Sequence, residues 1–188
     1  MEQIKRRVDV INACTDGRLK LKGPPLVETA VLQLRMVLET IALASLTANK
    51  EIFQLQSLQF EKHWHPGNIV KDLERINPRF YPNPIRESEP DERGIRDHEP
   101  LIDGFLTSQE LIEVHGRCGD LLHARNPFRP SIDYDAFFSK VIFWTNRVVN
   151  LLNTHEIRLL GDEHFYLVHM SEQDNDSVRM YAFEKVDA

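Results

Sequence analysis

The chain has 188 residues, of which 41% are hydrophobic and 28% are charged, and its formal net charge is -6 at pH 7. This length suits one domain with a sizeable buried core. The acidic balance argues against nonspecific coating of DNA or RNA, because that mode of binding needs many phosphate contacts from Lys and Arg. Two cysteines, Cys14 and Cys118, offer no disulfide framework, so we expect a reducing compartment.

Neither end of the sequence nor its interior predicts a membrane segment. Residues 1–7 lack the apolar core of a signal peptide. The most apolar stretch, residues 37–46, is interrupted by Glu39 and Thr40 and is too short to cross a bilayer. We therefore expect a cytoplasmic protein that does not bind membranes.

Apolar residues at helical spacing dominate most of the chain and predict a helical bundle. The predicted helices cover residues 2–15, 26–48, 51–61, 68–76 and 135–153. One more helix opens at the capping box Thr107-Ser108-Gln109-Glu110 and ends before the Asn126-Pro-Phe-Arg-Pro130 segment. The segment His63-Trp64-His65-Pro66-Gly67 reads as a turn between helices.

Two segments depart from the helical pattern. Residues 77–100 contain five prolines, which predict a long loop or lid. Residues 164–170 and 178–184 are rich in aromatic and β-branched side chains and flank a polar turn, so they predict a C-terminal β-hairpin. The expected fold is mainly α, with a helical bundle over residues 1–156 and a hairpin appendage over residues 157–188.

Three charged residues interrupt the apolar helix at 26–48. Glu28, Arg35 and Glu39 return to nearly the same helical face. An ion pair between Arg35 and Glu39 would satisfy both, because unpaired buried charge is very costly. The stripe is therefore either a structural ion pair at the edge of the bundle or the wall of a cleft that steadies a catalytic cation.

The most specific motif is Arg117 followed by His123, with five residues between them, near the end of a predicted helix. Arginine is a permanent cation with a planar fork that matches phosphate, and histidine exchanges protons near neutral pH. On a regular helix the two side chains would point in different directions. They converge only if Gly116 and Gly119 permit close helix approach, if the last turn frays, or if two subunits meet. Otherwise Arg117 pairs with Glu113 and His123 caps the helix.

These residues carry a resemblance to a known family. The chain resembles HEPN-domain proteins, α-helical bundles whose signature is Arg, four to six residues, then His. The segment Gln33-Leu-Arg-Met-Val-Leu-Glu39 is similar to the Arg-x-x-Leu-Glu segment that such proteins often carry on the facing long helix. The similarity covers residues 26–153. The family usually places a polar residue directly after the arginine, whereas this chain has Cys118.

The resemblance implies a metal-independent endoribonuclease of phage defence or of a toxin–antitoxin system. It also implies a homodimer in which two signatures line one cleft, with an antitoxin or other partner protein possible. Arg117, His123 and Glu39 would then be catalytic, and Arg35, Arg125 and Asn126 would contact the RNA. Arg117 would stabilise charge on the phosphate oxygens, and His123 would transfer a proton to or from the reacting oxygens.

Two other functions remain open. A non-catalytic member of the same fold would bind a protein or a nucleotide in the same cleft, and the acidic charge and Cys118 favour that reading. A metal-dependent hydrolase would instead use His63 and His65, two imidazoles on one short segment. The sequence has no glycine-rich phosphate loop, so we expect no nucleotide cofactor.

Overall fold

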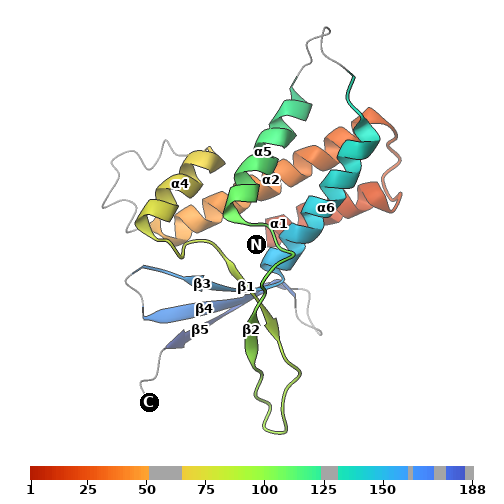
Figure 1. Ribbon diagram of the computed structural model, residues 1–188. Coiled ribbons are helices and arrows are strands. Elements are labelled where there is room, and N and C mark those ends of the chain that lie inside the picture. The colour runs from red at the N-terminus through yellow and green to blue at the C-terminus, as the bar shows by residue number, and fades with distance from the viewer. Residues whose placement is uncertain (51–64, 124–130, 161–162, 172–176, 185–188) are drawn as a thin grey trace.

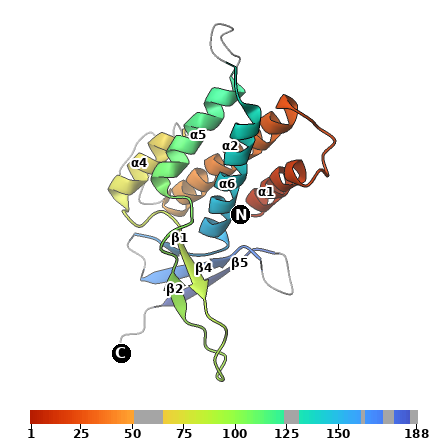
Figure 2. The same ribbon diagram turned by 45° about the vertical axis from the view of Figure 1, so that its right-hand side comes forward.

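The computed structural model describes residues 1–50, 65–123, 131–160, 163–171 and 177–184. In these ranges it contains a helical layer above an antiparallel sheet (Figures 1 and 2). The helices are α1 (Glu2–Thr15), α2 (Pro24–Ala48), α4 (Pro66–Ile76), α5 (Ser108–Leu122) and α6 (Tyr134–Leu152). The predicted helix at 51–61 lies outside the described residues.

α2 is the central helix, and it packs against each of the other four described helices. Many of its apolar side chains are buried among these helices, whereas Leu32 and Leu43 are exposed. The residues without any exposed surface are Ala30, Val31, Leu34, Val37 and Leu38. By length and composition α2 is also the one helix of the described ranges that could cross a membrane, and half of its apolar stretch is buried inside the protein.

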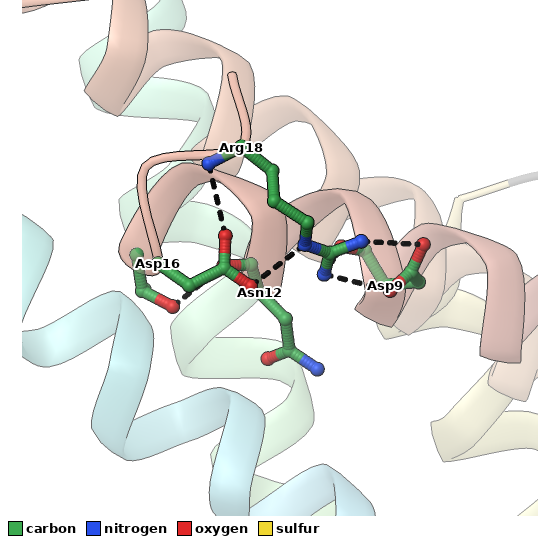
Figure 3. Close-up of polar contacts among 5 residues, drawn as sticks. Asp9, Asn12, Asp16 and Arg18 are labelled. Atoms are coloured by element: carbon green, nitrogen blue, oxygen red, sulfur yellow. Dashed lines mark hydrogen bonds and ion pairs between the residues drawn. The ribbon is translucent and has the colours of Figure 1, made fainter. Parts of the chain in front are cut away.

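α1 ends in a small polar cluster at the surface (Figure 3). Arg18 folds back along the helix, and its guanidinium forms ion pairs with Asp9 (Nη2–Oδ1, 2.9 Å) and Asp16 (Nε–Oδ2, 2.8 Å). Hydrogen bonds from Arg18 hold the pKa of Asp16 below its usual range. Gly17 lies just after the capping residue Asp16 and has a positive φ of 77°. The chain thus turns sharply away from α1 toward α2.

The capping box predicted at Thr107 is present. The Thr107 hydroxyl accepts a hydrogen bond from the Glu110 backbone N–H (3.2 Å), and the Glu110 carboxylate accepts one from the Thr107 N–H (2.9 Å). The same carboxylate binds the Arg147 guanidinium of α6 at 2.6 Å. Glu110 therefore caps α5 and also ties it to α6.

The sheet is larger than the sequence predicts. Its five antiparallel strands lie in the order β2-β1-β3-β4-β5. They are β1 (Asn83–Glu87), β2 (His98–Pro100), β3 (Thr154–Arg158), β4 (His164–His169) and β5 (Arg179–Glu184). The predicted hairpin is confirmed as β4 and β5. The fold is therefore an α/β arrangement rather than a bundle with only a terminal hairpin.

The prediction of a loop throughout residues 77–100 is wrong, because β1 and β2 lie within it. Prolines are tolerated here because the two halves of β1 pair with different strands. Asn83 and Pro84 pair with β3, whereas residues 85–87 pair with β2. The Pro84 carbonyl accepts a hydrogen bond from the Leu101 N–H (2.9 Å) and needs no N–H of its own for it.

Helices and sheet share side chains across their junction. Met170, directly after β4, belongs to the hydrophobic core of the helices, and its N–H donates to the Asn153 carbonyl (2.9 Å). His155 of β3 is fully buried, and its Nδ1 bonds the Leu152 carbonyl of α6 (2.8 Å). The predicted boundary between residues 156 and 157 falls inside β3, which pairs with β1 on one side and β4 on the other.

Candidate functional site

α5 presents two different faces to its surroundings. His115, Cys118 and Gly119 are buried on one face, whereas Arg117 and His123 are exposed. Spacings of three and four residues place His115, Cys118 and Gly119 together against α2. The helix therefore separates a buried polar centre from the exposed Arg–His pair.

The buried face meets α2 in a three-residue polar network. The Arg35 Nε donates to the Glu39 Oε1 at 3.0 Å, and the His115 Nε2 contacts the same oxygen at 3.0 Å. The side chain of His115 is only 6% exposed, whereas those of Arg35 and Glu39 are 27% and 26% exposed. Arg35 and Glu39 thus form the predicted ion pair, and it reaches across to α5.

The protonation of this network follows from burial and charge. Burial and the nearby Arg35 guanidinium lower the pKa of His115, although its bond to Glu39 acts in the opposite direction. Burial raises the pKa of Glu39, but hydrogen bonds from His115 and Arg35 outweigh this effect and bring it below its usual value. At neutral pH a neutral His115 donates its Nε2 hydrogen to an ionised Glu39.

Gly119 allows the close approach of Arg35 to α5. A Cβ at position 119 would lie 3.0 Å from the Arg35 Nη1. The neighbouring Cys118 is fully buried, and burial raises the pKa of its thiol to about 12. Cys118 therefore stays a protonated, packed thiol and supplies no nucleophile at neutral pH.

His65 lies beside this network as the N-cap residue of α4. Its ring contacts the ring of His115 edge to face, with centroids 5.5 Å apart. The turn predicted over residues 63–67 thus gives way to α4 at Pro66. His63 lies outside the described residues, and within the described ranges no group of three or more His, Cys, Asp or Glu side chains is placed to hold a metal ion.

The third charge of the α2 stripe binds a different helix. The Glu28 Oε1 accepts a hydrogen bond from the Tyr134 hydroxyl of α6 at 3.3 Å. Arg35 and Glu39 instead face α5. The stripe therefore secures α2 to two neighbouring helices rather than lining one cleft.

Arg117 and His123 take separate places on α5. The Arg117 guanidinium lies over the Trp144 ring of α6, with Cζ 5.9 Å from the ring centroid. In the described part of the chain Arg117 makes no ion pair with Glu113, which accepts a hydrogen bond from Gln109 (3.3 Å) instead. His123 is the C-cap residue, and its backbone N–H donates to the Gly119 carbonyl (3.1 Å). Arg125 and Asn126 lie outside the described residues.

His115 is the site residue that the sequence does not single out. Residues 111–123 offer several polar side chains, and the Arg–His spacing draws attention to Arg117 and His123. The useful signal is the small pair Cys118-Gly119, three and four residues after His115, which leaves room for a large partner side chain. Together with the buried acid Glu39 on α2, it points to His115 as the partner.

Comparisons of this chain with protein-family models, with curated proteins and with solved structures found no match. The functional argument therefore rests on the residues and on their geometry.

Proposed function

We propose that this protein is a metal-independent endoribonuclease that uses Arg117 and His123. The observation that carries the proposal is the exposure of both side chains on the C-terminal half of α5. Arg117 makes no ion pair with a described carboxylate, so its charge is available to a phosphate group. The buried network on the other face of α5 fixes the helix that presents them.

The chemistry follows from the two side chains. His123 takes the proton of a ribose 2′-hydroxyl, and the resulting oxygen attacks the adjacent phosphorus. The bond from phosphorus to the 5′-oxygen breaks, and this oxygen takes up the proton that His123 carries, which returns the imidazole to its neutral form. The products are a 2′,3′-cyclic phosphate and a 5′-hydroxyl end. Arg117 binds the non-bridging phosphate oxygens, on which negative charge grows in the transition state.

Arg35 and Glu39 have a different role in this proposal from the one that the family resemblance implies. Both are engaged with each other, and Glu39 also binds His115. We assign them to anchoring α5 against α2. Arg125 and Asn126 lie two and three residues after His123 in the sequence and remain proposed contacts to the RNA backbone.

The test is RNA cleavage in the presence of EDTA. Wild type is compared with Arg117→Ala, His123→Ala and the control Arg93→Ala, which removes an exposed arginine from the connection between β1 and β2. We expect His123→Ala to lose about 100-fold or more of the rate and Arg117→Ala about as much, with Arg93→Ala unchanged. Equal cleavage by all four proteins would assign the activity to another site or to a contaminant.

A shared cleft between two copies has its own test. Arg117→Ala and His123→Ala are each expected to have little activity alone, and in a shared cleft mixing them would create mixed dimers with one intact pair of Arg117 and His123. Recovered cleavage on mixing would place Arg117 of one copy beside His123 of the other. Toxicity of the wild type on expression, relieved by His123→Ala, would support a role in defence or as a toxin.

A non-catalytic binding module is the second candidate. The observation that favours it is the engagement of Arg117 with Trp144, together with the exposed apolar residues Ile142 and Phe143 on the adjoining helix α6. In that case folded wild type cleaves no RNA under any condition. Retained RNA binding without cleavage would then identify RNA as the ligand of the same surface.

A further inference from the structure

The two edges of the sheet differ in how they are protected. β2 has only three residues, which are His98, the charged Glu99 and Pro100. A short strand with a proline and charge resists pairing with another chain. β5 has six residues and forms an uninterrupted register with β4. It contains no proline, no lysine and no bulge, and no described strand pairs with its outer edge.

β5 is also apolar and exposed. All six of its residues are exposed, including Met180 at 64% and Phe183 at 40%. Aromatic residues favour pleated, half-buried strands. The four residues between Arg179 and Glu184 carry no charge and no proline, so this central part of the edge is a template for pairing with a further strand.

We propose that β5 pairs with β5 of a second copy of this chain, in an antiparallel register with Tyr181 opposite Tyr181. The strand begins with Arg179 and ends with Glu184. An antiparallel copy brings these opposite charges to the same end of the pair, whereas a parallel copy would align like charges. A two-fold axis perpendicular to the sheet generates this arrangement and gives identical contacts to both copies.

The aromatic contacts already in the sheet select this register. In the β3–β4 pair, Arg158 lies opposite Phe165 and its Cζ is 5.5 Å from the ring centroid. Phe165 in turn stacks on Phe183 of β5, with centroids 5.0 Å apart and planes inclined by 12°. With Tyr181 at the axis, Arg179 of the second copy lies opposite Phe183. The Arg–Phe contact seen between Arg158 and Phe165 is then repeated between the two copies, by Arg179 of one and Phe183 of the other.

The neighbouring register is less favourable. If Ala182 lay on the axis, the apolar Met180 would face the charged Glu184 of the second copy. With Tyr181 on the axis, Met180 instead faces Ala182, and the charged ends of the strands lie outside the apolar centre. Side-chain chemistry along β5 therefore favours the Tyr181 register.

This interface is separate from the proposed ribonuclease site. β5 lies at the end of the molecule away from the C-terminal end of α5, as Figures 1 and 2 show. Breaking the β5 pair is therefore expected to leave the cleavage rate per chain unchanged. Failure of either proposal leaves the other one standing.

The first experiment measures the mass of the full chain in solution by light scattering after gel filtration. Tyr181→Lys places two lysines opposite each other at the axis, and its mass is expected to be half that of the wild type. The control Ile95→Lys changes an exposed apolar residue outside the strand and keeps the wild-type mass. Circular dichroism verifies that each variant is folded. A wild type and a Tyr181→Lys variant of equal mass would overturn the proposal.

The second experiment tests the register by cysteine cross-linking. Directly opposite residues in an antiparallel pair have Cα atoms about 4.5–5.5 Å apart, which a disulfide can bridge. Under mild oxidation Tyr181→Cys is expected to form a cross-linked dimer. Glu184→Cys is expected to form none, because in this register the two residues at position 184 lie far from each other. The native Cys14 and Cys118 are buried and serve as the background. Absence of a Tyr181→Cys dimer, or equal cross-linking of both variants, would reject this register.

Discussion

Two glycines on α5, three residues apart, separate the effect of helix propensity from that of close packing. Neither has a positive φ, so both are ordinary helical positions. A Cβ added at Gly116 meets no atom within 4 Å, whereas one added at Gly119 lies 3.0 Å from the Arg35 Nη1. The two sites therefore share their backbone but differ in their contact with α2.

Alanine gains the same helix propensity at both positions, but only at Gly119 does it also disturb a contact with α2. Gly116→Ala should stabilise the fold by about 0.5–1 kcal/mol through helix propensity alone. Gly119→Ala should be about 1 kcal/mol less stable than Gly116→Ala, because the displaced guanidinium weakens its hydrogen bond to Glu39. Urea unfolding of both variants measures the difference. Equal stabilisation by both would show that Arg35 moves at no cost and that Gly119 is not needed for its approach.

His155 is the buried residue that makes the fold sensitive to acid. Its Nδ1 donates to the Leu152 carbonyl, and its buried Nε2 has no hydrogen-bond partner among the described residues. Burial lowers the pKa of His155 to about 4, and the nearby His169 acts in the same direction. The folded protein therefore holds His155 in its neutral form.

The expected pH dependence follows from this lowered pKa. Between pH 6.5 and 4 the unfolded chain binds a proton at His155 that the folded chain does not bind. The contribution of His155 to the free energy of unfolding is therefore fully present above about pH 6.5. It falls by about 3 kcal/mol as the pH approaches 4. Urea unfolding across this range should show a shallower slope for His155→Gln, with the remaining slope contributed by His115 and, toward pH 4, by the carboxyls of Glu39 and Glu110, whose pKa values are also lowered in the folded protein.

At the level of whole elements, the helices follow closely from the sequence. The predicted bounds of the first helix match α1, and those of the last differ from α6 by one residue at each end. Two starts are earlier than predicted, at Pro24 and Pro66, because proline suits the first turn of a helix, where no N–H is required. Local rules of periodicity and capping are sufficient for these elements.

The strands β1, β2 and β3 could not be predicted in the same way. β2 and β1 contain prolines and charges and lack apolar alternation, and β3 begins only two residues after α6 ends. They form strands because residues distant in sequence pair with them, as Asn83 does with Glu156. The Glu39–His115 contact could not be predicted for the same reason, because its two residues lie 76 positions apart in the sequence.

The capping box of α5 allows a test at the scale of one helix. Thr107→Ala removes the oxygen that accepts the Glu110 N–H, and we expect a loss of about 1 kcal/mol in the free energy of unfolding. Thr107→Ser keeps the hydroxyl and should remain close to the wild type. Glu110→Ala should cost more than Thr107→Ala, because this carboxylate also binds Arg147. Equal losses for Thr107→Ala and Glu110→Ala would mean that the link to α6 contributes nothing.

At the scale of the whole molecule, the sheet and the helices are connected in several places far apart in the sequence. β3 pairs with β4 along five residues, and Met170 enters the helical core. The Glu2 carboxylate at the start of α1 accepts a hydrogen bond from the Val178 N–H, just before β5 (2.9 Å). These contacts join the last strands to both the first and the last helix.

These contacts predict the behaviour of a chain that ends after residue 156. Such a fragment loses the strand partner of β3 and the Met170 side chain, which leaves a buried apolar region open to water and a strand edge unpaired. We expect the 1–156 fragment to lack a cooperative thermal transition by circular dichroism and to aggregate during gel filtration. A peptide of residues 157–188 added in trans should restore part of the helical signal, because it supplies the same contacts without covalent linkage.

The opposite outcome has an equally definite meaning for the organisation of the chain. A 1–156 fragment that is monomeric and melts cooperatively near the wild-type temperature would show that the helices and the β1–β2 pair form a self-sufficient unit. β4 and β5 would then be an appendage, as the pattern of residues 157–188 predicts. The burial of Met170 and His155 argues against that outcome, since cutting after residue 156 removes one of these side chains and exposes the other.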